Sequence, residues 1–175
     1  MDIDDVFRGK VDVCVFYLAW WIDEASAAKH TEDFEVRFGF KPQKHFGWIG
    51  SWRPPDYGVL SEQLKRLNAL AGERKGPGVV IMPPLLDPPD LERYYTDHDC
   101  SFGFDRCVSI FSAVEINSNG DMSPCRDYHD FVVGNVKEHT ITEIWNAEPY
   151  KKFRKSLTDK GLMPVCTRCC GLMGY

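Results

Sequence analysis

The sequence lacks an excess of positive charge and any long hydrophobic run. Its 21 Lys and Arg residues stand against 26 Asp and Glu, a formal charge of −5, and this balance argues against a nucleic-acid partner. The longest apolar stretch, Val13 to Ile22, is too short to cross a bilayer, so we expect no membrane partner. The start of the chain, Met1 to Asp5, is acidic where a signal peptide would be basic. We therefore predict a cytoplasmic protein.

Cysteine is plentiful, by contrast, with seven residues and no export signal that would take them to an oxidising compartment. Reducing compartments keep thiols free, so metal binding is favoured over a disulfide scaffold. Four cysteines form two unequal pairs: Cys107 and Cys125 lie far apart, whereas Cys166 and Cys169 form a C-x-x-C. Zinc sites usually combine two close pairs around one small ion, and an iron-sulfur cluster accepts wider spacing. The spacing favours a cluster, with zinc in the same site as the alternative.

The first half of the chain alternates strand and helix signals. The predicted elements are a buried strand at 11–21, a helix at 23–32, a strand at 34–40, an aromatic-rich loop at 41–57, a helix at 60–72, a strand at 79–82 and a short helix at 88–95. Such alternation is typical of α/β folds whose parallel strands are joined by right-handed crossovers. Three strands are few for a complete sheet of this kind.

The pattern changes after Cys100. Asn119-Gly120 lies between β-rich runs at 108–116 and 122–125, which is the strongest short signal for a hairpin. We predict one more strand at 131–133, a helix that starts with a capping box at 140–143, and a second helix from Pro149 to Gly161. This α+β pattern returns the chain to the C-x-x-C pair.

Several spaced elements together resemble the auxiliary-cluster domain of radical S-adenosylmethionine enzymes, of the SPASM or shortened twitch type. They are Cys107-x12-Gly120-x4-Cys125, Gly134-Asn135, Ile144-Trp145-Asn146 and Cys166-x2-Cys169. The resemblance covers about residues 100 to 175 and implies one auxiliary 4Fe-4S cluster, bound by Cys107, Cys125, Cys166 and Cys169, for electron transfer or substrate anchoring. Cys170 and Cys100 are further candidates to join or replace a ligand, and Cys14 is most simply a core residue.

In that family the cluster domain follows a partial β/α barrel, which is similar to the pattern of residues 11–96. We accordingly expect the last strands and helices of such a barrel in residues 1–98 and a twitch-like iron-sulfur domain in residues 99–175. The family's radical-generating motif, C-x3-C-x2-C, is absent from this sequence. The chain is therefore not expected to cleave S-adenosylmethionine alone, and its expected partners are an N-terminal radical SAM barrel portion and a peptide or small-molecule substrate.

Two other classes stay open beside this one: a zinc-stabilised, non-enzymatic binding module, and a metal-free domain with buried structural thiols. Trp20, Trp21 and Asp23 follow the first predicted strand, where barrel enzymes place their sites. Core positions for the tryptophans and a helix N-cap for Asp23 are the favoured interpretations. Residues 126–129 follow a predicted ligand and either surround the cluster or form a solvated loop.

Overall fold

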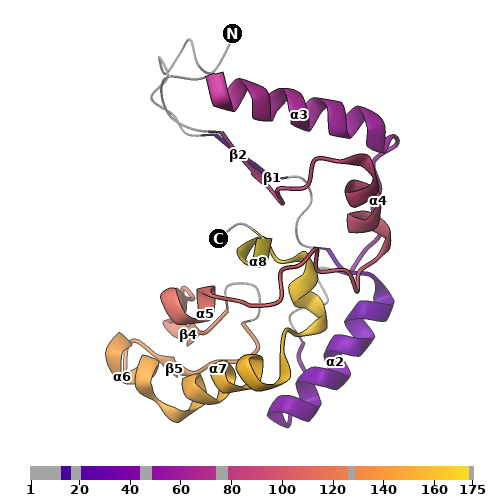
Figure 1. The fold of residues 1–175 in the computed structure, drawn as a ribbon. Coiled ribbons are helices and arrows are strands. Elements are labelled where there is room, and N and C mark those ends of the chain that lie inside the picture. The colour runs from indigo at the N-terminus through magenta and orange to yellow at the C-terminus, as the bar shows by residue number, and fades with distance from the viewer. Residues whose placement is uncertain (1–12, 17–20, 44–48, 74–78, 126–128, 174–175) are drawn as a thin grey trace.

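The computed structural model describes residues 13–16, 21–43, 49–73, 79–125 and 129–173 of the chain. Its first elements are β1 (Val13–Phe16), α2 (Glu24–Phe38), α3 (Tyr57–Glu73), β2 (Val79–Met82) and α4 (Pro88–Thr96). The remaining elements are α5 (Ser109–Ser112), β3 (Glu115–Ile116), β4 (Asp121–Ser123), β5 (Gly134–Asn135), α6 (Ile141–Asn146), α7 (Glu148–Lys160), the 3-10 helix η2 (Pro164–Arg168) and α8 (Cys170–Met173). Figure 1 shows α3, α4 and the β1–β2 pair above α2 and the later elements.

The upper sheet consists of β1 and β2, which pair in parallel with Val13 opposite Val79 and Phe16 opposite Met82. Helix α3 packs on β2 and on α4. The parallel pairing and the helices at 57–73 and 88–96 confirm the predicted α/β elements of this part. The described residues form only two of the three predicted strands here, so the partial barrel stays a prediction.

The strand predicted at 34–40 is wrong, because α2 continues through Phe38. Phe34 and Phe38 are four positions apart, so they fit one face of a helix as well as one face of a strand. Val36, which a strand would bury beside them, is 73% exposed. The N-cap prediction is confirmed: the Asp23 carboxylate accepts a hydrogen bond from the Ser26 amide at 2.7 Å.

The lower sheet is antiparallel, in the order β3-β4-β5. The predicted hairpin is confirmed: β3 and β4 pair across a turn in which the Gly120 amide donates to the Asn117 carbonyl. The strand predicted at 131–133 is wrong, since the segment that pairs with β4 is Gly134–Asn135, directly after the predicted residues. The run at 108–116 begins with the single helical turn α5, and only its end is a strand. The capping box is confirmed at the start of α6.

The buried hydrophobic residues form two cores. The lower core combines Phe38 of α2 with Phe131 and Phe153, whose rings lie 4.5 Å and 5.5 Å from that of Phe38 between centroids. The upper core combines residues of α3, β2 and α4 with Trp21 and with Leu172 of α8. Packing therefore crosses the predicted boundary at residue 98 in both directions, since α2 enters the lower core and α8 enters the upper one.

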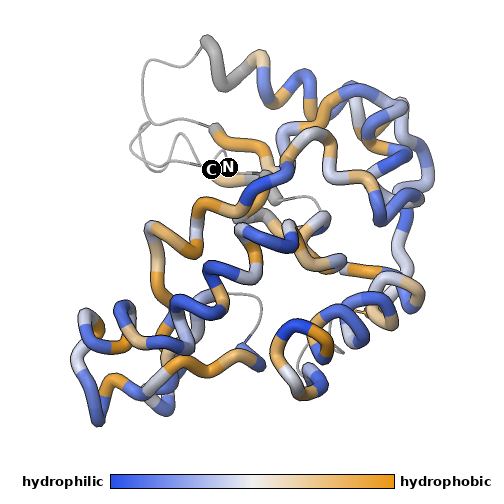
Figure 2. Tube along the Cα trace, turned by 60° about the horizontal axis from the view of Figure 1, so that its bottom comes forward, coloured by the Kyte–Doolittle hydropathy of each residue, from blue (hydrophilic) through white to orange (hydrophobic). Residues whose placement is uncertain are grey.

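The helices bury one face each. In Figure 2 their tubes alternate between hydrophilic and hydrophobic colours along the chain, as expected when one stripe faces a core. No helix in the described residues combines the length and apolar character that a membrane crossing requires.

Candidate metal centre

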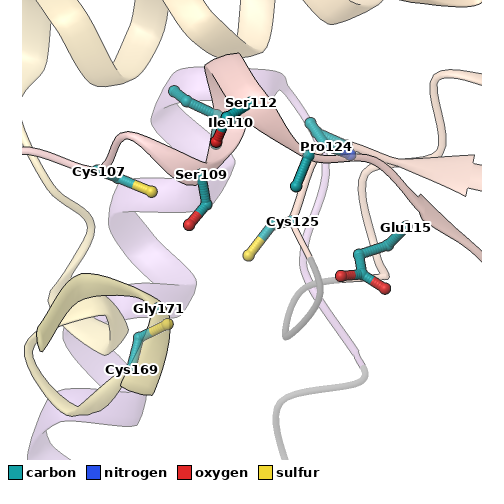
Figure 3. Close-up of a pocket in the computed structure, with 10 residues that line it drawn as sticks. Cys107, Ser109, Ile110, Ser112, Glu115, Pro124, Cys125, Cys169 and Gly171 are labelled. Carbon is teal, nitrogen blue, oxygen red and sulfur yellow. The ribbon is translucent and has the colours of Figure 1, made fainter. Parts of the chain in front are cut away.

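Three of the predicted ligands line one cavity of about 220 Å³ between the lower sheet and α8. They are Cys107, Cys125 and Cys169, and Figure 3 shows their sulfur atoms pointing toward a common space together with the hydroxyl of Ser109. A single buried water needs only about 10–15 Å³ of such volume. The cavity is thus large enough for a bulky group between segments that are distant in sequence.

Cys107 is held in place by α7 through the turn that follows it. Arg154 of α7 donates from Nε to the Ile110 carbonyl of α5 at 3.1 Å, and Tyr150 donates its hydroxyl to the Ala113 carbonyl at 3.1 Å. The guanidinium of Arg154 lies 3.9 Å from the Trp145 ring centroid and 4.0 Å from that of Tyr150. Burial raises the pKa of Tyr150, so its hydroxyl stays a proton donor at neutral pH.

Cys125 follows strand β4 of the hairpin. Close contacts fix the hairpin turn at Gly120 and the neighbouring strand β5 at Gly134. A Cβ on Gly120, whose φ is +93°, would lie 2.7 Å from Oδ1 of Asn135. Asn135 in turn donates to the Asp121 carboxylate at 3.0 Å. A Cβ on Gly134 would meet the Ile144 side chain at 3.0 Å. The glycines and the asparagine thus have packing roles that set the direction in which β4 leads to Cys125.

Cys169 lies at the end of the C-x-x-C segment, whose backbone is folded as η2. The Cys169 amide donates to the Cys166 carbonyl at 3.1 Å, and the Thr167 hydroxyl donates to the His98 carbonyl at 2.8 Å. The segment is therefore joined by a hydrogen bond to the loop after α4, and Cys166 packs in the lower core with Met122 of the hairpin.

Arg168, between the two cysteines of this segment, is only 1% exposed. In the described part of the chain its guanidinium donates to five backbone carbonyls, those of Arg93, Tyr94, Asp97, Cys100 and Thr167. Three of these belong to the carboxyl end of α4, where the helix carbonyls carry partial negative charge. Burial lowers the pKa of this guanidinium, yet the carbonyls and the Tyr94 ring, 4.8 Å away, surround the cation. Arg168 was missed from the sequence, because C-x-x-C spacing does not reveal what its middle residues contact.

His98 lies on the loop after α4 and is 6% exposed. Its ring centroid is 4.5 Å from that of Trp21, in an edge-on contact. Burial and the nearby Arg168 charge lower the pKa of His98. The imidazole is therefore neutral at pH 7. A neutral ring avoids both the cost of burying a charge and repulsion from the guanidinium of Arg168. Trp21 itself belongs to the upper core, as predicted.

Gly171 leaves the space beside Cys169 open. A Cβ built on it would lie 3.5 Å from the Cys169 sulfur and 3.4 Å from the Ser109 hydroxyl oxygen, and its φ lies outside the left-handed region. Both the backbone and these ordinary van der Waals distances accept an alanine, so glycine leaves extra room here but is not required by the fold.

The other predicted site residues lie elsewhere. Cys166 is buried in the lower core and does not line the cavity. Cys100 is half-buried and its carbonyl accepts from Arg168. The prediction that Cys14 is a core residue is wrong: its side chain is exposed, since the described residues leave its side of the two-stranded sheet uncovered. Residues 126–128 and the side chain of Cys170 fall outside what the structure describes.

The cysteines do not converge on a single point. Among the described residues no three His, Cys, Asp or Glu side chains lie close enough together to hold one metal ion. A tetrahedral zinc ion needs its sulfurs at about 2.3 Å from the metal, and hence about 4 Å from one another. The three thiols instead line the walls of a wider space. The six cysteines whose side chains are described form no disulfide.

Residues 107–170 match the family model of the SPASM iron-sulfur cluster-binding domain. The match begins at Cys107, ends at Cys170 and includes all four predicted ligands. No curated protein and no solved structure matches the chain. The comparison therefore supports iron-sulfur cluster binding by this part of the chain, in agreement with the resemblance carried by its motifs.

Proposed function

We propose that the predicted ligands Cys107, Cys125, Cys166 and Cys169 bind one 4Fe-4S cluster at this cavity, and that this cluster is auxiliary to a radical S-adenosylmethionine reaction. The observation that carries the proposal is the convergence of three thiols, from two distant segments, on one cavity. A cluster presents separate iron corners to ligands that stand apart, as these do. The SPASM match over the same residues supports the same group.

The walls of the cavity suit a redox group. Beside the three thiols they combine the apolar side chains of Ile110, Ala113 and Pro124 with the polar side chains of Ser109, Ser112 and Glu115. The polarity of these walls and their hydrogen-bonding groups are among the factors that set the reduction potential of a cluster. When bound, the cluster would supply one-electron transfer or a Lewis-acidic iron that anchors a substrate.

The radical chemistry itself would come from a partner. The sequence contains no C-x3-C-x2-C motif, so we infer that an N-terminal radical SAM barrel portion acts together with this chain on a peptide or a small molecule. The parallel β1–β2 pair with α3 packed on β2 is consistent with the end of such a barrel. The chain alone would hold the auxiliary cluster without starting the reaction.

Anaerobic reconstitution with iron and sulfide tests the cluster. We expect about four irons per chain and broad brown absorbance, with most of both lost in Cys125→Ala. Cys14→Ala is the matched control, because Cys14 is an exposed thiol on β1, outside the cavity, and it should retain the full iron content. A colourless protein with one zinc per chain would contradict the proposal and favour the zinc-stabilised module.

A further inference from the structure

A groove of about 800 Å³ runs along one face of α2, away from the metal centre. Its α2 wall consists of residues at positions i, i+3, i+4, i+7 and i+8 of the helix, which share one face: Lys29, Glu32, Asp33, Val36 and Arg37. The opposite wall comes from the loop after α4 and from the segment between α7 and η2. Helix α2 packs against η2, and Figure 1 shows the two side by side. Among the described residues, none lines both this groove and the cavity of the three cysteines.

Arg37 joins the two walls of the groove. Its side chain is 4% exposed, and its Nε lies 2.7 Å from the Asp33 carboxylate. Its guanidinium also donates to the carbonyls of Gly161 at 2.8 Å and Leu162 at 3.3 Å. Arg37 is therefore bound within the protein, and a ligand would meet the other charges of the groove.

These charges are mostly negative. The carboxylates that line the groove belong to Glu32, Asp33, Asp99 and Asp105, and the described cations that line it are Lys29 and Arg37. Lys29 pairs with Asp99 at 2.7 Å. Glu32 is exposed and takes part in none of the ion pairs among the described residues. The groove therefore repels anions and attracts cations.

His98 provides an independent observation. It lines the groove although it is 6% exposed, and its Nδ1 atom is buried without a hydrogen-bond partner in the described part of the chain. Buried polar atoms are nearly always hydrogen-bonded, so each exception needs an explanation. In the neutral imidazole protonated at Nε2, Nδ1 accepts a hydrogen bond. A ligand that brings an N–H donor into the groove would supply the partner that His98 lacks.

We propose that this groove binds a guanidinium or ammonium group carried on an aliphatic stem. Such a group combines a positive charge with several N–H donors, which suit the His98 nitrogen and the carboxylates of Glu32 and Asp105. Val36, which is 73% exposed on the same face of α2, offers an apolar contact for the stem. The inference goes beyond the proposed function, because the groove is separate from the cavity and its ligand needs no cluster.

Binding is tested by nuclear magnetic resonance on the full chain, with the imidazole signal of His98 as the readout. The probes are butylguanidinium and the peptide acetyl-Gly-Arg-Gly-amide, and the control peptide carries citrulline, which has nearly the same shape but no charge. We expect both cations to shift the His98 signal until it saturates, and the citrulline peptide to leave it unchanged. Tighter binding of the arginine peptide would identify a peptide side chain as the ligand, and equal affinity would identify a free cation. The absence of a saturable shift with either cation would overturn the inference.

Variants separate binding from folding, with the affinity for butylguanidinium measured by calorimetry. His98→Phe keeps a ring but removes a nitrogen that has no partner, so the free energy of unfolding should change little. Its affinity should nevertheless fall about tenfold, because one hydrogen bond to a charged group is lost.

Glu32→Gln provides a second test that does not change the buried ring. We expect its affinity to fall about two- to fivefold. Glu35→Gln is the matched control, since it makes the same change at an exposed position of α2 outside the groove, and it should bind like the parent. Parent affinity in Glu32→Gln and in a folded His98→Phe would overturn the inference.

This inference and the proposed function fail in different ways. If the parent chain takes up four irons but binds neither cation, only the groove assignment fails. If it binds the cations but takes up no iron, only the proposed function fails.

Discussion

The two segments that bring cysteines to the cavity are held by two arginines in different ways. Residues 107–125, the hairpin segment, are held through α5 by Arg154, which donates to the carbonyls of Ile110 and Trp145 and lies over two aromatic rings. Residues 166–169, the knuckle, are held by Arg168, which is 1% exposed and donates to five carbonyls. The knuckle is thus fixed by buried hydrogen bonds, and the hairpin segment by packing with partial access to water. The relative position of the thiols depends on groups outside the cysteine motif.

Replacing Arg168 should have the largest effect. Arg168→Met removes a buried cation and its five hydrogen bonds to backbone carbonyls, and we expect a loss of about 3–5 kcal/mol in the free energy of unfolding, measured by urea denaturation. Arg168→Lys keeps the charge but cannot reach five acceptors with one ammonium group. Its unfolding free energy should therefore lie between that of the parent and that of Arg168→Met. A loss below about 1 kcal/mol in Arg168→Met would show that the knuckle does not depend on these bonds.

Replacing Arg154 should cost less. We expect Arg154→Met to lose about 1–3 kcal/mol, because two hydrogen bonds and the stacking on Trp145 and Tyr150 disappear at a partly exposed site. Arg53→Met, a change at an exposed arginine, serves as the control and should stay within about 0.5 kcal/mol of the parent. If Arg154→Met proves as costly as Arg168→Met, the difference between the two segments does not hold.

Filling the space at Gly171 should separate stability from cluster binding. Gly171→Ala is expected to change the free energy of unfolding by less than about 1 kcal/mol, since the backbone accepts alanine. Iron uptake should nevertheless fall, because the new methyl group lies against the Cys169 sulfur and the Ser109 hydroxyl. Full iron content in this variant would mean that the cluster does not use this part of the cavity.

The smallest expected effect is a pH dependence that comes from His98. Its pKa is lowered in the folded state by burial and by Arg168, so the unfolded chain binds the proton more tightly. The stability that this group contributes is present above the unfolded pKa of about 6.5 and is lost as pH falls toward the folded pKa. The unfolding free energy, measured at pH 7.5 and 5.5, should decrease on acidification by more in the parent than in His98→Gln. Equal decreases would contradict this assignment.

The sequence predicted those parts of the fold that depend on local signals. Asp23 and Thr140 cap helices as their side chains indicate, and Asn119-Gly120 forms the hairpin turn. The prediction of a strand at 34–40 was wrong, because aromatic residues four positions apart fit the period of a helix as well as that of a strand. Only tertiary packing shows which of the two periods is used. Helix α2 packs in the lower core and α8 packs in the upper one. No local feature of the sequence indicates either arrangement.

The candidate site was predicted in part. Cys107, Cys125 and Cys169 line one cavity, as the motif spacing indicated, whereas the position of Cys166 depends on the contacts of its neighbours. Arg168 and Gly171 act through distances to residues far away in sequence. A single sequence without its fold does not contain such distances.

The central claim is that the hairpin segment and the knuckle bind one cluster together. It is tested most directly by iron counting with Mössbauer spectroscopy on reconstituted parent protein, Cys107→Ala and Cys169→Ala. The account predicts one 4Fe-4S signal of about four irons per chain in the parent and its loss in both variants. A full signal in either variant would contradict it, because the cluster would then be bound without a cysteine from one of the two segments.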